Sequence, residues 1–216
     1  METGLWGSND IIHYHEPLSD RVEMAVVKFL IEHPNCTFEE ILRDAATHLP
    51  GLLTPSLGLV GEVLVSYAEQ AEGRWVLRAE DQPSKRKAEL IQMADLLHSI
   101  GARLDFYTNR LDERTLVWEV GETSEYVIHL KASAVLGQAV VESPYPRERS
   151  LVVLPAGRAS LLAYKSGRDP ALAERLKGFR FIKFRLVRAL AGIPVLNLKT
   201  FETRIASDPI ETTRNR

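Results

Sequence analysis

The sequence predicts an α/β fold in two parts, a helical N-terminal module and a sheet that is covered by helices. Residues 19–71 carry three runs of apolar residues at helical spacing, and a short strand follows at 75–77. After residue 84, the sequence predicts one helix, then three strands, and then a further helix and strand. This order is typical of a sheet packed between helical layers, so the fold class is α/β, or α+β for the chain as a whole.

Composition limits the classes of protein to which the chain can belong. Its 216 residues are 45% hydrophobic and 26% charged, which is ordinary for a soluble globular protein. We find no apolar run long enough to cross a bilayer and no charged-then-apolar leader, so no membrane partner is expected. Cys36 is the sole cysteine, which excludes an internal disulfide and fits a reducing, cytoplasmic location.

Residues 19–80 outline a winged-helix-like module, behind an extended arm at residues 1–18. Its three helices are expected to begin at helix caps, and a short strand follows the third helix. The expected caps are Ser19, Thr37 of a Thr-Phe-Glu-Glu capping box, and Thr54 ahead of a proline. The third helix is expected to reach about residue 71.

The third helix of a winged helix usually enters the major groove of DNA. Here that segment carries Glu62, Glu69 and Glu72 and no lysine or arginine. Residues 19–72 hold nine acids and three bases, a net of −6 that repels phosphate groups. The acidic module is therefore expected to contact a protein partner or to serve as scaffold, and a winged-helix transcriptional regulator is the alternative.

Residues 84–205 are predicted to form the α/β domain, and residues 206–216 a tail. Ser84 is the expected cap of its first helix, which Gly101 ends. The expected strands lie at residues 104–107, 115–120, 126–132, 150–154 and 179–184. Further helices are expected at residues 133–142 and 156–165. Another is expected to begin at Asp169-Pro170, and a last one at Leu186.

Three segments carry unusual strings of residues. They are Leu-Ser-Asp-Arg-Val at residues 18–22, Leu-Leu-Thr-Pro at 52–55 and Trp-Val-Leu-Arg-Ala-Glu-Asp-Gln-Pro-Ser-Lys-Arg at 75–86. These segments resemble the C-terminal end of large bacterial adenine-specific DNA methyltransferases, many of which act in restriction and phage defence. The resemblance implies that residues 18–110 belong with their accessory region. The sequence has no Asp/Asn-Pro-Pro-Tyr/Phe signature and no glycine-rich loop for S-adenosylmethionine, so it lacks the methyltransferase core.

A second resemblance centres on His129-Leu-Lys131, at the end of the third expected strand. Alternate residues of a strand face the same side, so an acid and a lysine at this spacing can act on one metal-bound water. The order of elements from 84 to 191 resembles the restriction-endonuclease-like fold, named PD-(D/E)xK for its motif. In that family two acids and the lysine form the site. Here Thr115, three residues before Trp118, and His129 take the acid positions, and only Lys131 is retained.

The resemblance therefore implies a nuclease fold without its catalytic acids, and no metal cofactor. His129 also fits a hydrogen-bonded core histidine, and Lys131 a side chain that extends from a strand to the solvent. The alternative is an active Mg²⁺-dependent nuclease with relocated ligands, built from Glu89, Glu119 and Lys131. A further acidic set consists of Glu119 and Glu125 with Asp112 or Glu113.

Residues 147–216 hold fifteen basic and six acidic residues, a net of +9. Such charge asymmetry indicates a basic face for a polyanion such as DNA. The candidate nucleic-acid-binding residues are Arg158, Lys165, Arg168, Arg180, Lys183, Arg185 and Arg188. The sequence thus predicts a non-catalytic DNA-contacting or assembly subunit, associated with a methyltransferase-based defence or DNA-modification system.

Overall fold

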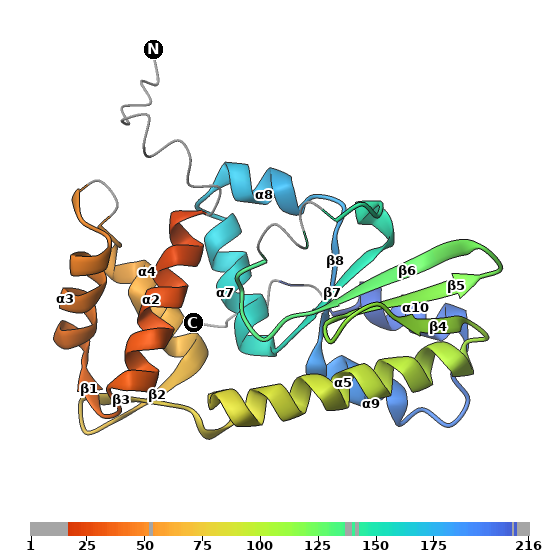
Figure 1. Ribbon diagram of the computed structural model, residues 1–216, viewed down its shortest axis with the longest axis horizontal. Coiled ribbons are helices and arrows are strands. Elements are labelled where there is room, and N and C mark those ends of the chain that lie inside the picture. Colours follow the sequence, from red (N-terminus) through yellow and green to blue (C-terminus); the bar gives the residue numbers. More distant parts are fainter. Residues whose placement is uncertain (1–16, 52–53, 137–139, 141–142, 209, 211–216) are drawn as a thin grey trace, which may run out of the picture.

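The computed structural model describes residues 17–51, 54–136, 140, 143–208 and 210, so most of the predicted arm and tail lies outside the described residues. Figure 1 shows a helical part at one end and a five-stranded sheet at the other, with the long helix α5 (Pro83–Arg103) running along the sheet. The fold is mixed α/β, as predicted. Within the described ranges, no helix is both long and apolar enough to span a bilayer.

The N-terminal module consists of three helices and a small antiparallel sheet. Its elements are α2 (Leu18–Glu32), β1 (Cys36–Thr37), α3 (Phe38–His48), α4 (Leu57–Tyr67), β2 (Ala68–Ala71) and β3 (Arg74–Leu77). The strands follow the order β1-β3-β2, and both pairs are antiparallel. A strand between the first two helices and a hairpin behind the third give the module a winged-helix-like arrangement.

The helix starts follow the predicted caps in one case and depart from them in two. The Thr37 hydroxyl accepts the Glu40 N–H while the Glu40 carboxylate accepts the Thr37 N–H, so the capping box is present. Helix α2 starts one residue before the predicted Ser19 cap. Helix α4 is capped by the Ser56 side chain instead of Thr54.

The third helix of the module is shorter than predicted. It ends at Tyr67, and residues 68–71 form a strand that pairs with β3. Glu72 and Gly73 connect the two strands, with φ angles of 51° and 78°. Positive φ at both residues of a two-residue loop suits the right-handed twist of a hairpin, so this turn fixes the strand pairing.

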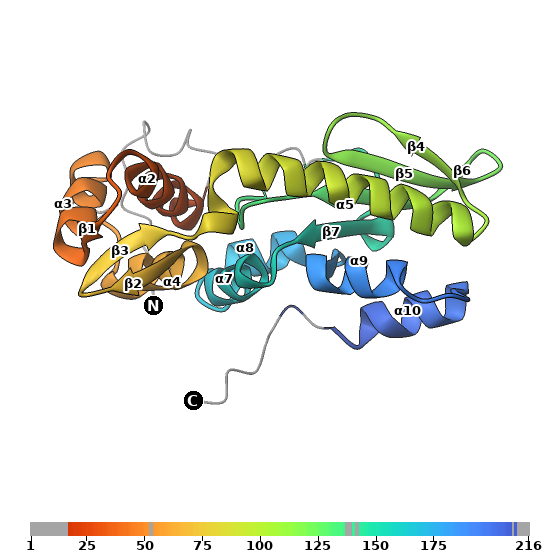
Figure 2. The ribbon, with the colours of Figure 1, turned by 90° about the horizontal axis from the view of Figure 1, so that it is seen from below.

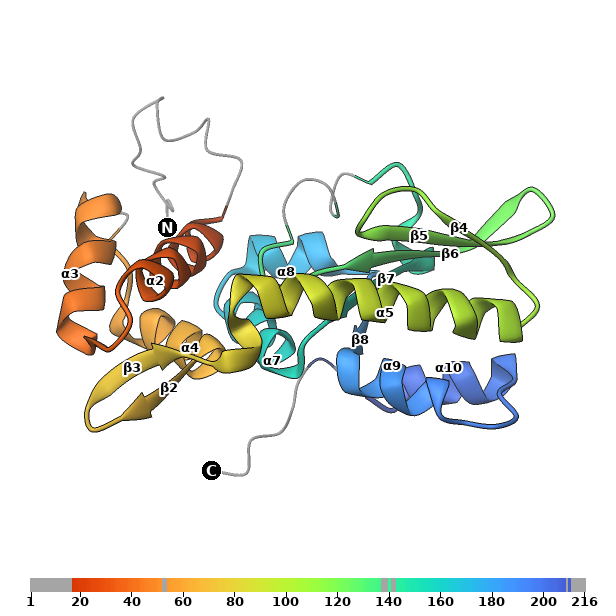
Figure 3. The ribbon, with the colours of Figure 1, turned by 60° about the horizontal axis from the view of Figure 1, so that its bottom comes forward.

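The second part is a five-stranded mixed sheet with helices on both faces. Its strands are β4 (Tyr107–Arg110), β5 (Thr115–Val120), β6 (Thr123–Leu130), β7 (Ser150–Leu154) and β8 (Arg180–Lys183), in that spatial order. The helices that follow α5 along the chain are α7 (Ala156–Ser166), α8 (Pro170–Leu176), α9 (Phe184–Ala191) and α10 (Leu198–Ala206). Strands β4, β5 and β6 form an antiparallel meander, whereas β6, β7 and β8 run parallel. Helices α5, α9 and α10 cover one face, and α7 covers the other (Figures 2 and 3).

Three of the helices predicted for the second part differ from those in the structure. Helix α5 starts at Pro83, without a Ser84 cap, and continues through Gly101. The expected last helix is two helices, α9 and α10, and the Asn197 side chain caps the second. Residues 133–136 are not helical, and most of the remainder of the helix expected there lies outside the described residues.

The two parts share a hydrophobic core. A cluster of buried side chains joins α2 and α4 of the module to α7, α8 and one face of the sheet. Helix α4 lies against both α2 and α7. Gly157 in α7 permits this close approach, because a Cβ there would lie 3.1 Å from the Ser66 carbonyl oxygen. A second cluster fills the space between the other face of the sheet and α5, α9 and α10.

Candidate functional site: a cleft beside strands β5 and β6

The structure brings Thr115, His129 and Lys131 to one end of the sheet. Thr115 begins β5 and lies directly opposite His129 on β6. The Leu130 N–H donates to the Arg114 carbonyl at 2.7 Å, and the Lys131 N–H donates to the Val153 carbonyl at 2.9 Å. These bonds extend the β5-β6-β7 pairing to the end of the predicted motif, so the predicted positions are spatial neighbours.

His129 is a neutral, buried side chain at physiological pH. Burial, and after it the positive charge of Lys131, lower its pKa to about 4 against the opposing effect of Asp112. Its Nε2 has no hydrogen-bond partner among the described residues. The position at which the resemblance would place a metal-binding carboxylate is therefore occupied by an uncharged ring.

Lys131 is half-buried and carries a lowered pKa, caused first by burial and then by the neighbouring Arg114 guanidinium, with Asp112 opposing. Its amine makes no hydrogen bond or ion pair with the residues that the structure describes. Asp112 uses one carboxylate oxygen to accept the Arg114 N–H at 2.6 Å, which closes the turn before β5. The two cations at this end of the sheet, Arg114 and Lys131, are thus matched in number by Asp112 and Glu113.

The relocated metal site is not assembled. The Glu89 carboxylate pairs with both Arg86 and Arg188. Glu119 lies opposite Ser124 near the β5-β6 turn. Lys131 follows the other end of β6, roughly 20 Å away at about 3.3 Å per residue. The prediction that Glu89, Glu119 and Lys131 share an ion is therefore wrong.

The further acidic set fails for the same reason. Glu119 and Glu125 flank the β5-β6 turn, whereas Asp112 and Glu113 precede the opposite end of β5. Among the described residues, no three His, Cys, Asp or Glu side chains are grouped as metal ligands would be.

Three of the predicted nucleic-acid-binding residues are inside the protein. The exposed fractions are 1% for Arg158 and 2% each for Lys165 and Lys183. The prediction that they contact nucleic acid is wrong, because a buried cation cannot reach a phosphate group. Their positive charges meet acids of this chain instead.

Arg158 and Lys165 join the second part to the N-terminal module. The Arg158 guanidinium pairs with Asp81, donates to the Ser66 hydroxyl at 2.8 Å and lies 3.1 Å from the centre of the Tyr67 ring. The Lys165 ammonium pairs with Asp20 at 2.7 Å and with Glu23, and Glu23 also accepts the Tyr67 hydroxyl. Part of the charge asymmetry along the chain is therefore satisfied within the molecule.

The other predicted cations also have partners. Arg180 pairs with Glu202 at 2.7 Å, Lys183 with Asp208 at 3.0 Å, Arg185 with Asp208 at 2.8 Å, and Arg188 with Glu89. Arg168 lies over the Tyr164 ring, 3.7 Å from its centre. The net charge of residues 147–216 suggested one basic surface. The structure does not gather these residues into such a surface.

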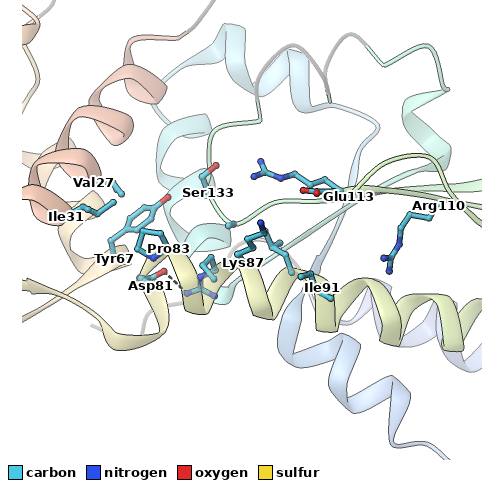
Figure 4. A pocket seen from close by; sticks show the side chains of 14 residues that line it. Val27, Ile31, Tyr67, Asp81, Pro83, Lys87, Ile91, Arg110, Glu113 and Ser133 are labelled. Carbon is cyan, nitrogen blue, oxygen red and sulfur yellow. Dashed lines mark hydrogen bonds and ion pairs between the residues drawn. The ribbon is translucent and has the colours of Figure 1, made fainter.

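A cleft of about 690 Å³ lies beside the strand pair and was not predicted. Figure 4 shows Val27 and Ile31 of α2 on one side, Lys87 and Ile91 of α5 on another, and Ser133 on the strand side. The loop before β5 contributes Glu113 and Arg114. Five segments distant in sequence form the lining, so no local pattern could reveal the cleft.

A scan against protein-family models, a search of curated proteins and a search of solved structures each found no match to this chain.

Proposed function

We propose that the protein is a non-catalytic assembly subunit with a restriction-endonuclease-like domain, acting with a DNA methyltransferase in a defence or DNA-modification system. The observation that carries the proposal is the neutral His129 ring opposite Thr115, where a nuclease of this kind would need two carboxylates. The sequence resemblance at residues 18–22, 52–55 and 75–86 supports the methyltransferase partner.

The order of the elements supports a nuclease-like ancestry. Helix α5 precedes an antiparallel meander, and β7, α7 and β8 follow with parallel strands. The register of β5 and β6 aligns the two positions at which that fold holds its acids. The third position of the motif has its lysine, Lys131. Neither acid position carries a carboxylate, the charged oxygen ligand through which proteins usually hold Mg²⁺.

Two observations favour assembly over DNA reading. Helix α4, which would enter the major groove in a winged helix, packs against α2 and α7, and the large side chains that it leaves exposed, Leu57 and Val65, are apolar. The predicted DNA-contacting cations are buried or paired with acids of this chain, apart from Arg168 on its aromatic ring. A winged-helix regulator would also need basic residues on this helix to neutralise phosphate groups, and α4 has no lysine or arginine.

Restoring the acids tests the non-catalytic assignment. We expect the wild-type protein neither to cut DNA with Mg²⁺ or Mn²⁺ nor to release heat on Mn²⁺ titration. The double variant Thr115→Asp, His129→Glu should bind Mn²⁺, because it returns two carboxylates to opposite positions of β5 and β6. Cleavage by the wild type that Lys131→Ala abolishes would contradict the proposal.

Affinity purification of the tagged chain from its native host tests the assembly role. We expect a DNA methyltransferase to co-purify in stoichiometric amount at high salt, where contacts through DNA are weakened. Recovery of the chain alone, or only of duplex DNA at low salt, would refute the assembly role.

A further inference from the structure

Helix α2 has a second apolar stripe that faces away from the core of the module. Val22, Val26 and Leu30 are buried, whereas Met24 and Ile31, about two helical turns apart, are exposed on the outer side. Val27 lies between the two sides, half-buried and packed against the core. Ile31 remains 45% exposed. A helix with a single apolar face needs one partner surface, so a second stripe indicates a second partner.

Helix α5 supplies the opposite wall of the same cleft. Leu90 and Ile91 line it together with Pro83, and Ile91 is 51% exposed. The cleft therefore presents aliphatic side chains from two helices toward one shared space (Figure 4). Contiguous exposed apolar surface of this kind marks an interaction site more often than isolated exposed residues do.

The rim of the cleft is positively charged. Lys87 and Arg114 have side chains without an ion pair among the described residues, and Arg110 pairs only with the exposed Asp95 at 3.0 Å. Of the two acids that line the cleft, Asp81 is buried against Arg158, which leaves Glu113 as the exposed one. The occupant that complements this rim is apolar in the middle and acidic at its edges.

We propose that the cleft between α2 and α5 receives an amphipathic, acidic α-helix of a protein partner, an inference that rests on the assembly role above. A volume of about 690 Å³ accommodates a few side chains but no folded domain. An amphipathic helix inserts apolar residues at positions i, i+3 or i+4, and i+7 into such a groove. Its acidic residues then meet Lys87 and Arg114 at the rim.

The chemistry of the walls favours a helix over a nucleic acid strand. Single strands bind through basic residues and exposed aromatic rings on which bases stack. The aromatic residue that lines this cleft is Tyr67, which is buried with the Arg158 guanidinium over its ring. The apolar part of the lining, to which Val27, Ile31, Leu90 and Ile91 belong, is aliphatic and suits leucine or isoleucine side chains.

Selection from two matched peptide libraries tests the proposal on the full chain. Both libraries display helices of about four turns, roughly 15 residues, with Leu or Ile at i, i+3 and i+7. One carries Glu at the flanking positions and the other carries Lys. We expect binders from the Glu library alone. Ile31→Glu or Ile91→Glu should weaken them by at least about tenfold, since either change places a charge in the apolar wall.

Val195→Glu is the matched control, because Val195 is 82% exposed and lies outside the cleft. It should leave peptide affinity unchanged. Equal recovery from both libraries, no binder from either, or unaltered affinity of the Ile91→Glu variant would overturn the proposal. Displacement of a bound peptide by a single-stranded oligonucleotide, dependent on Lys87, would assign the cleft to nucleic acid and overturn it too.

Co-purification of the methyltransferase with the wild-type and Ile91→Glu chains distinguishes failure of this inference from failure of the assembly role. If the complex forms normally with the Ile91→Glu chain, the partner uses another surface and only the helix proposal fails. If no complex forms with the wild type, the assembly role itself fails.

Discussion

At the scale of single residues, His129 has the largest consequence for function. His129 lies two residues before Lys131, as the acid does in the nuclease motif, and the sequence allows it to be either a metal ligand or a core histidine. The structure places the ring in the core, buried and neutral, but among the described residues its Nε2 lacks the hydrogen bond that was expected of a core histidine. Sequence alone does not determine burial here, because the covering side chains come from other parts of the chain.

Protonation of His129 should reduce stability in mild acid. Its folded pKa of about 4 lies below the unfolded value of 6.5, so the unfolded chain binds the proton first. The stabilisation is complete above pH 6.5 and is lost as the pH falls toward 4, by up to roughly 3 kcal/mol. Urea unfolding at neutral pH and near pH 4.5 measures this loss.

The His129→Leu variant is the control, because it keeps the site apolar and removes the titrating group. Its unfolding free energy should fall less steeply over the same pH interval than that of the wild type. An identical pH dependence for the two proteins would show that His129 is not held neutral by burial.

At the scale of elements, strong local patterns were predictive and weak ones were not. Strand β5 has the predicted bounds, because Thr-Leu-Val-Trp-Glu-Val is rich in β-branched and aromatic residues between two turns. Strand β2 (Ala-Glu-Gln-Ala) was missed since its residues have little strand preference and pairing with β3 holds them. The start of α10 as a separate helix was missed, because its apolar residues, Phe201 and Ile205 among them, are few.

Gly101 was predicted to end α5, yet the helix passes through it. The reason is close packing: a Cβ at this position would lie 2.5 Å from Thr108 Cγ2 and 2.7 Å from the Trp118 ring. Trp118 is fully buried and contacts Phe106, Tyr126 and Phe201, so it has little room to move. Gly101 thus sets the distance between α5 and the sheet.

Gly101→Ala should therefore destabilise the protein by about 1–3 kcal/mol through overpacking. Gly61→Ala in α4 is the matched control, since a Cβ there finds nothing within 4 Å. That second change should stabilise the helix by about 0.5–1 kcal/mol. Thermal and urea unfolding of both variants measure the difference, and a neutral Gly101→Ala would refute the packing argument.

At the scale of the whole molecule, charge counts along the chain overstated the charge that is available to an outside partner. The acidic module and the basic C-terminal third were each assigned to an outside partner. In the structure, Asp20 and Glu23 pair with Lys165, and Asp81 pairs with Arg158. A count of charges cannot tell which of them meet across an interface, and these pairs join residues 77 to 145 positions apart.

Lys165 should be central to the attachment of the module, because its ammonium neutralises two carboxylates in a buried interface. Lys165→Met keeps a side chain of similar length but removes that charge, so we expect a loss of about 3–5 kcal/mol in the free energy of unfolding. Adding Asp20→Asn and Glu23→Gln should recover part of the loss, since the uncompensated buried charge is then gone. Lys177→Met, which removes an exposed pair with Glu174, should cost less than about 1 kcal/mol. If Lys165→Met and Lys177→Met unfold at the same urea concentration, the buried pair does not hold the two parts together.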